Sequence, residues 1–313
     1  ILSGLVGSEM CIRDRNSALS RPIGEFLSST PSTKALDNTR LRLEESLQDS
    51  RRQNQALYRQ LMTYQTQPRM DIWRKELIWA WNQALWDAPA KVLAKGDPDP
   101  HLLLTTQLAP ELSGVGKELI MISAYFVPGQ PGLVYLTGRA DAGVSVSLLT
   151  NSLEATDVPV VHGGYAPYRK ALLEHGVKLY ELRRQPGERG GSGPHLFHSG
   201  SYKGSDSSLH SKAMIFDRRK SFIGSFNFDP RSVLWNTEVG VLVDSPELAE
   251  HVRALALQGM APALSYQVKL LDGKLVWVTE DQGQLHSLGH EPGNWWRRFN
   301  AWLSTRIGLE RML

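Results

Sequence analysis

The chain has 313 residues and a formal net charge of +3 at pH 7, which is too small to indicate nucleic-acid binding by itself. Its 41% hydrophobic and 21% charged residues exclude a fibrous or disordered protein. The single cysteine, Cys11, excludes an internal disulfide framework and a cysteine-based metal site, and no apolar run reaches the roughly 18 residues of a membrane-spanning helix.

The first 15 residues, ILSGLVGSEMCIRDR, differ in character from those that follow. They do not begin with Met, and they lack the basic start and long apolar stretch of a signal peptide. They resemble a translated sequencing-adapter read. We therefore predict that residues 1–15 are a non-native segment that packs against nothing, and that the reading frame is truncated. An ordinary N-terminal segment is the alternative.

Residues 16–100 form the second predicted unit, a helical remnant or linker. Residues 34–67 combine charges with Leu at helical spacing and contain neither Gly nor Pro, which predicts a solvated amphipathic helix or helix pair. A Trp-rich stretch follows. Such residues can face a membrane or nucleic acid, but they more often pack against a core; they are Trp73, Trp79, Trp81 and Trp86. The turn-rich segment 95–101 predicts the end of this unit.

Residues 101–313 form the third predicted unit, where short strands alternate with helices. Apolar runs at 118–129, 143–152 and 177–182 predict buried strands, and residues 165–176 predict an amphipathic helix that stops at a glycine. A Gly- and Ser-rich loop follows. This order predicts an α/β sandwich with a mixed central sheet flanked by helices.

The segment LHSKAMIFDRRKSFIGSFN, residues 209–227, predicts a hairpin with functional groups on one face. Alternation places His210 and Lys212 on the same face of the first strand. DRRK is a turn, and the returning strand brings Ser225 and Asn227 to the same place. Gly224 allows a close approach of the backbone.

These groups suit a phosphodiester. Lys212 and Asn227 can bind the non-bridging oxygens, while His210 attacks phosphorus or protonates the leaving oxygen. Asp217 lies at the strand end and cannot join them directly, so its role is structural or is to orient a histidine from another strand. A single strand histidine is more often an ordinary core or surface residue. The combined spacing nevertheless predicts a site.

The six spaced positions resemble the HKD motif of the phospholipase D superfamily; they are His210, Lys212, Asp217, Gly224, Ser225 and Asn227. The flanks, such as FNFDPRSVLWNTEVGVLVDSPELAEHV, resemble the second half of bacterial cardiolipin synthases, especially the C-type. The resemblance implies a phospholipase D-like fold and no metal or other cofactor. It assigns catalysis to His210, Lys212 and Asp217. It assigns substrate binding to Ser225, Asn227 and Glu238, where Glu238 orients the partner histidine, and a structural role to Gly224.

Members of the family carry two such motifs, which face each other across a pseudo-twofold axis. One histidine forms a phosphohistidine, and the other acts as general acid and then base. Of the nine histidines here, His210 alone has a Lys two positions later. The segment NSALSRPIGEF resembles the residues that follow the first motif. This implies that the first half was lost upstream and that the chain alone is inactive. A functional homodimer is the alternative.

The implied activity is phosphatidyl transfer to phosphatidylglycerol or a similar alcohol, giving cardiolipin, peripherally at the bacterial inner membrane. C-terminal aromatic residues between Trp295 and Trp302, interspersed with arginines, suit an anionic lipid surface. A packed amphipathic helix is equally compatible with them. The rival functions are a phosphodiesterase or nuclease and an inactive interaction fragment. No basic strip interleaved with aromatics is evident, so no nucleic-acid partner is expected.

Overall fold

The computed structural model describes residues 32–53, 77–184 and 209–307. The predictions for residues 1–15, for Trp73 and for the Gly- and Ser-rich loop lie outside these ranges. The chain divides into a small unit, Ala18–Trp79, and a larger one that includes Ala80–Leu313. In the small unit, helix α2 (Thr33–Gln53) exposes its leucines, as expected for a solvated helix.

The larger unit is built on a mixed sheet. Strands β2, β3 and β4 run parallel, and every other neighbouring pair in the described sheet is antiparallel. The spatial order is β1-β7-β6-β5-β2-β3-β4-β8-β9-β10. The strands are β1 (Trp81–Trp86), β2 (Glu118–Ile122), β3 (Ser145–Asn151), β4 (Lys178–Leu182), β5 (Ala213–Phe216), β6 (Lys220–Gly224), β7 (Val239–Asp244), β8 (Ser265–Leu271), β9 (Lys274–Asp281) and β10 (Gln284–Leu288).

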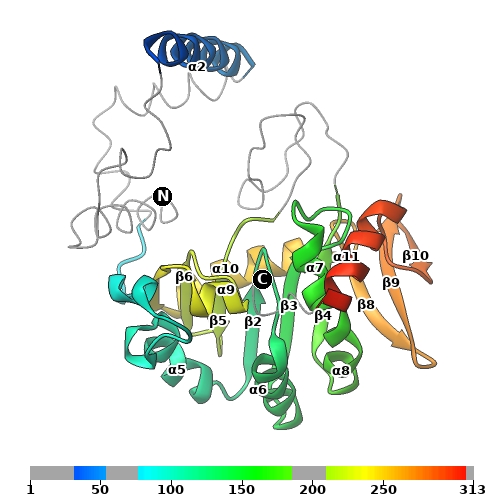
Figure 1. The fold of residues 1–313 in the computed structure, drawn as a ribbon. Helices are drawn as coiled ribbons and strands as arrows, with labels where there is room; N and C mark the ends of the chain where they lie inside the picture. Colours follow the sequence, from blue (N-terminus) through cyan, green and yellow to red (C-terminus); the bar gives the residue numbers. More distant parts are fainter. Residues whose placement is uncertain (1–31, 54–76, 185–208, 308–313) are drawn as a thin grey trace. The chain divides into compact units, whose positions relative to one another are not determined.

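Helices cover both faces of this sheet, which confirms the predicted fold class (Figure 1). Side chains alternate along β2, so Leu119 and Met121 enter one core while Ile120 and Ile122 enter the other. The first core packs under α5, α6 and α8, and the second under α10. The helices are α5 (Leu104–Gly114), α6 (Gly129–Asp141), α7 (Pro159–Tyr165), α8 (Arg169–Glu174), α9 (Pro230–Leu234), α10 (Pro246–Gly259) and α11 (Trp295–Ile307), with 3-10 turns η2 (Pro89–Leu93), η3 (Pro100–Leu102) and η4 (Ala166–Tyr168).

The larger unit begins before the predicted boundary at residue 100. Strand β1, placed in the helical linker by sequence, pairs with β7 at the edge of the sheet. Just after it, Lys91 and Asp87 form a buried ion pair at 2.7 Å. The prediction that the tryptophans pack against a core is wrong for Trp79 and Trp81, which are 79% and 60% exposed. Trp81 begins β1, an edge strand with a neighbour on one side only, so its side chain is less covered.

The hairpin of β5 and β6 forms as predicted, but its first strand is shorter. It starts at Ala213, so His210 and Lys212 precede the strand. The side chain of Asn151 holds the backbone of Leu209. Asn151 Oδ1 accepts a hydrogen bond from the Leu209 N–H at 2.8 Å, and Asn151 Nδ2 donates one to the Leu209 carbonyl at 3.0 Å. Among the described helices, none is long and apolar enough to cross a membrane.

Candidate active site

The hairpin brings four of the predicted residues to one end of the sheet. His210 and Lys212 stand just before β5, and Ser225 and Asn227 stand just after β6. The pairing of Ala213 with Ile223 places these two ends side by side. The C-terminal ends of β2 and β3 lie at this same end of the sheet, where ligand sites of α/β sheets commonly lie.

Lys212 is nearly buried, and its ammonium donates a hydrogen bond to the His210 carbonyl at 2.7 Å. Burial lowers the pKa of Lys212, although the carboxylates of Glu238, Asp157 and Asp229 act in the opposite direction. Burial also lowers the pKa of His210, and the positive charge of Lys212 lowers it further. The imidazole is therefore neutral near pH 7, the form in which it can act as a nucleophile or base.

This arrangement predicts that His210 titrates below the ordinary histidine pKa of about 6.5. Because a lowered pKa favours the uncharged ring, the neutral form persists to lower pH than in an unperturbed histidine. Replacing Lys212 by Ala removes the like charge, so we expect the pKa of His210 to rise toward the ordinary value. NMR titration of the imidazole signals measures this in the chain as given. An ordinary pKa of His210 that Lys212→Ala leaves unchanged would contradict the electrostatic effect of Lys212 on the imidazole.

Asn227 is held by the backbone and keeps a free amide. Its Oδ1 accepts a hydrogen bond from the Tyr125 N–H at 3.2 Å. Within the described ranges its Nδ2 has no hydrogen-bond partner, which leaves it free to bind a phosphate oxygen. The Ser225 hydroxyl donates to Glu238 and accepts from the Val239 N–H at 3.1 Å. Burial raises the pKa of Glu238, partly offset by the hydrogen bond from Ser225.

Glu238 is in turn positioned by the segment that sequence analysis assigned to the linker. Its N–H donates to the Asp87 carboxylate at 2.8 Å, and Asp87 also binds the Leu104 N–H at 2.6 Å. Lys91 pairs with Asp87 and donates to the Ser232 carbonyl at 2.9 Å. The buried ion pair therefore ties β1 to the end of the sheet that holds the candidate site.

Asp217 lies apart from the other residues of the motif. Asp217 follows β5, at the opposite end of this strand from His210. Its carboxylate accepts hydrogen bonds from the N–H groups of Gly116, Lys117 and Glu118 at 3.0, 2.7 and 2.9 Å. Burial raises the pKa of Asp217, but these N–H groups outweigh it and hold the pKa below its ordinary value. Asp217 therefore secures the start of β2, a contact that fits the structural one of the two roles expected for it.

Gly224 lies where a side chain cannot fit. A Cβ there would stand 2.4 Å from the Val239 carbonyl oxygen and 2.7 Å from the Gly240 Cα, both backbone atoms. We expect Gly224→Ala to lower the free energy of unfolding by about 1–3 kcal/mol through overpacking. Gly138→Ala in α6 is the matched control, because a Cβ there meets nothing within 4 Å. Urea denaturation followed by tryptophan fluorescence measures both. Equal stability of Gly224→Ala and the parent chain would contradict this packing.

Two acidic residues near Lys212 were missed in the sequence. Asp229 is buried, and burial raises its pKa to about 6 even though the Ser232 N–H and Lys212 act in the opposite direction. Asp157 accepts hydrogen bonds from the Tyr125 hydroxyl at 2.9 and 2.8 Å. Both act electrostatically on Lys212. No local pattern identified them, because they approach the motif only through the fold.

One group of side chains has the composition of a metal site. Ligand atoms of His162, Glu181 and Glu291 lie within 4.8 Å of one another. Arg169 occupies the space among them: it donates to Glu181 at 2.7 Å and contacts both Glu291 and His162. Because the guanidinium already neutralises these carboxylates and would repel a cation, the cluster does not fit a metal ion.

The sequence of this chain is similar to those of known proteins. Residues 108–258 match the family model described as cardiolipin synthase, PLD-like domain. Cardiolipin synthase C of Escherichia coli is 38% identical over 239 residues, covering 76% of this chain and 49% of the relative. Cardiolipin synthase B of E. coli is 28% identical over 184 residues, covering 58% of this chain and 38% of the relative. The chain thus spans about half or less of these curated relatives.

Among solved structures, the phospholipase D family member Nuc from Salmonella typhimurium gives a TM-score of 0.43 at 14% identity. The similarity covers 61% of this chain and 99% of Nuc.

Proposed function

The chain belongs to the phospholipase D superfamily, and on this premise we propose that its site transfers a phosphatidyl group to the glycerol of phosphatidylglycerol or a similar alcohol, giving cardiolipin. The observation that carries the proposal is the convergence of His210, Lys212 and Asn227 at one end of the hairpin. Together they offer a nucleophile, a positive charge and an unpaired amide. Those are the groups that a phosphodiester requires.

The proposed reaction has two steps. In the first, a neutral imidazole forms a bond to phosphorus while the bond from phosphorus to the leaving alcohol breaks, and a protonated second histidine gives its proton to the leaving oxygen. In the second, the now neutral second histidine takes a proton from the acceptor hydroxyl. The acceptor oxygen then bonds to phosphorus, and the bond to the first histidine breaks. Lys212 and Asn227 bind the non-bridging oxygens throughout.

The lowered pKa of His210 supports its assignment as the nucleophile. The second histidine belongs, in this proposal, to an opposing half with its own motif. Residues 16–100 would then link the two halves, with β1 and the Asp87–Lys91 pair as part of the second. A second copy of this chain is the alternative source of that histidine.

We place the active protein at an anionic lipid surface, peripheral to the bacterial inner membrane, and α11 supports this placement. Its exposed face carries aromatic side chains that contact one another: Trp295, Trp296, Phe299 and Trp302. Arg297 anchors the helix by donating to the carbonyls of Leu153 at 3.1 Å and Thr156 at 2.6 Å. Large exposed aromatics beside arginines suit the interface of an anionic bilayer better than bulk water.

The test uses the two-motif protein, defined as residues 16–313 joined to a first half that carries the opposing motif. It is incubated with phosphatidylglycerol, and the lipids are identified by mass spectrometry. Cardiolipin with release of glycerol supports the proposal. Phosphatidic acid as the sole product would make the protein a phosphodiesterase instead. Cleavage of DNA without any lipid product would support the nuclease alternative.

A further inference from the structure

Asp157, in the loop between β3 and α7, is a charged residue to which the proposed reaction assigns no role. Both of its carboxylate oxygens accept hydrogen bonds from the Tyr125 hydroxyl, at 2.9 and 2.8 Å. Burial raises the pKa of Tyr125 above its ordinary value, and the hydrogen bond to Asp157 raises it further, so the hydroxyl stays protonated and donates. Tyr125 follows β2, so the pair fixes a carboxylate near the C-terminal ends of β2 and β3.

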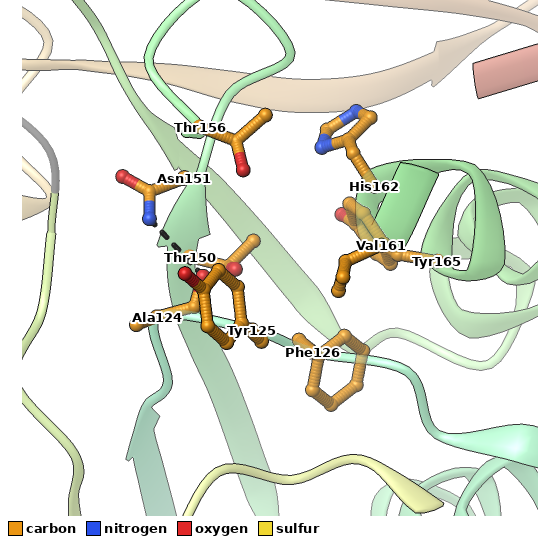
Figure 2. A pocket seen from close by; sticks show the side chains of 9 residues that line it. All are labelled: Ala124, Tyr125, Phe126, Thr150, Asn151, Thr156, Val161, His162 and Tyr165. Carbon is orange, nitrogen blue, oxygen red and sulfur yellow. Dashed lines mark hydrogen bonds between the residues drawn. The ribbon is translucent and has the colours of Figure 1, made fainter. Parts of the chain in front are cut away.

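One amide side chain places this pair near His210. Asn151, the last residue of β3, donates a hydrogen bond to the Ala124 carbonyl at 3.0 Å, which is dashed in Figure 2. It also binds both backbone groups of Leu209. These two partners directly precede Tyr125 and His210 in the chain, so Asn151 brings both residues to the same point.

Two charged side chains of the described segments act on His210, and they act in opposite directions. Burial and the positive charge of Lys212 lower the pKa of His210, whereas the negative charge of Asp157 raises it. Asp157 acts in the same way on Lys212, together with Glu238 and Asp229. Of these three acidic residues, Asp157 is the one whose charge also reaches His210.

The described contacts give Asp157 no task in the fold beyond its bond to Tyr125. The N-cap of α7 is Val158, and no side chain caps this helix. The Val158 N–H donates instead to the Thr156 hydroxyl at 3.2 Å. Within the described ranges, no Lys, Arg or His pairs with the Asp157 carboxylate. Its negative charge is therefore available to the site.

A fixed negative charge suits the intermediate of the proposed reaction. When a neutral imidazole bonds to phosphorus and keeps the proton on its other nitrogen, the ring becomes a cation. This charge develops as the bond forms and disappears when the acceptor oxygen displaces the ring. A nearby carboxylate stabilises the cation, but it repels the anionic phosphodiester in the ground state. It therefore favours the transition state over the bound substrate.

We propose that Asp157 is a positioning residue of this site: held by Tyr125, it sets a negative charge near His210 that stabilises the cationic ring of the phosphatidyl-histidine intermediate. The inference rests on the proposed function and deepens it, because it adds a residue outside the HKD motif to the same site. Asp157 acts through the His210 ring and neither gives nor takes a proton.

The first test is NMR titration of His210 in the chain as given, which requires no turnover. Asp157→Asn keeps an oxygen that can accept from Tyr125 but removes the charge. Because a negative charge favours the protonated ring, its loss should lower the pKa of His210 further. Asp157→Glu keeps the charge and should keep the pKa near that of the parent chain. An unchanged His210 pKa in Asp157→Asn would overturn the inference.

The second test is the rate of cardiolipin formation by the two-motif protein. We expect Asp157→Asn to lower kcat on the order of tenfold, because one charge interaction is lost in the transition state. KM should stay the same or fall, because the carboxylate that repels the bound phosphodiester is gone. A residue that only maintains the shape of the site would instead raise KM when it is replaced.

Asp141→Asn is the matched control. The exposed carboxylate of Asp141, at the end of α6, also contacts one side chain through both oxygens, that of His175 at 2.8 and 2.9 Å. Its replacement should change neither the pKa of His210 nor kcat. If Asp157→Asn does not fold, Tyr125→Phe gives the test, because it removes the donor that fixes Asp157 and should lower the pKa of His210 in the same direction.

The outcomes separate this inference from the proposed function. A lowered His210 pKa with an unchanged kcat in Asp157→Asn would overturn the role of Asp157 in the reaction and keep the proposed function. A raised KM without any change in the His210 pKa would show a purely structural role and also overturn the inference. Absence of cardiolipin from the parent two-motif protein would overturn the proposed function, and the inference with it.

Discussion

Replacing His210 by Ala in the two-motif protein is expected to abolish cardiolipin formation from phosphatidylglycerol. Among the described residues at this end of the hairpin, His210 alone carries an imidazole, and the Ser225 hydroxyl is already engaged by Glu238 and the Val239 N–H. If His210 serves only as acid and base, its loss still costs roughly 10²–10⁴-fold in rate. If it is the nucleophile, the covalent route closes altogether. Mass spectrometry of the cardiolipin that accumulates measures the loss of activity.

His251→Ala is the matched control for that experiment. His251 is exposed on α10 and takes no part in the site, so its loss should leave the rate unchanged. A His210→Ala protein that forms cardiolipin at a near-normal rate would show that the phosphatidyl group does not pass through this residue.

The chain as given is expected to form no cardiolipin on its own. Acid and nucleophile must stand on opposite sides of one phosphorus atom, and an imidazole bonded to phosphorus cannot also protonate the leaving group. Addition of the opposing half should restore the product. Formation of cardiolipin by the chain alone, at a rate that rises with the square of its concentration, would contradict this prediction and support a site built from two copies.

The sequence predicted the hairpin of β5 and β6 well, because the determinants of a hairpin are local. The turn residues limit where the chain can reverse, and the pairing of the two strands brings their ends together, although His210 and Lys212 lie before β5 and not within it. Asp217 and Arg218 do adopt positive φ values of 52° and 56° in that turn. The close approach at Gly224 also follows from the residue type at that position.

The features that were missed depend on contacts between distant segments. Asn151 binds Leu209 across 58 positions, and Glu238 binds Asp87 across 151. The spacing of residues within one segment of the sequence does not indicate contacts between segments so far apart. Strand β1 was assigned to the linker because a six-residue edge strand next to a helical pattern carries a weak signal. The raised pKa of Asp229 comes first from burial, which belongs to the assembled fold.

In the proposed reaction, His210 passes a phosphatidyl group between phospholipids. Mass spectrometry of the two-motif protein after rapid quenching with phosphatidylglycerol tests it most directly. We expect a phosphatidyl adduct on a histidine, cardiolipin as the product, and loss of the product in His210→Ala. Cardiolipin formed equally well by His210→Ala, or an adduct on another residue type, would contradict it.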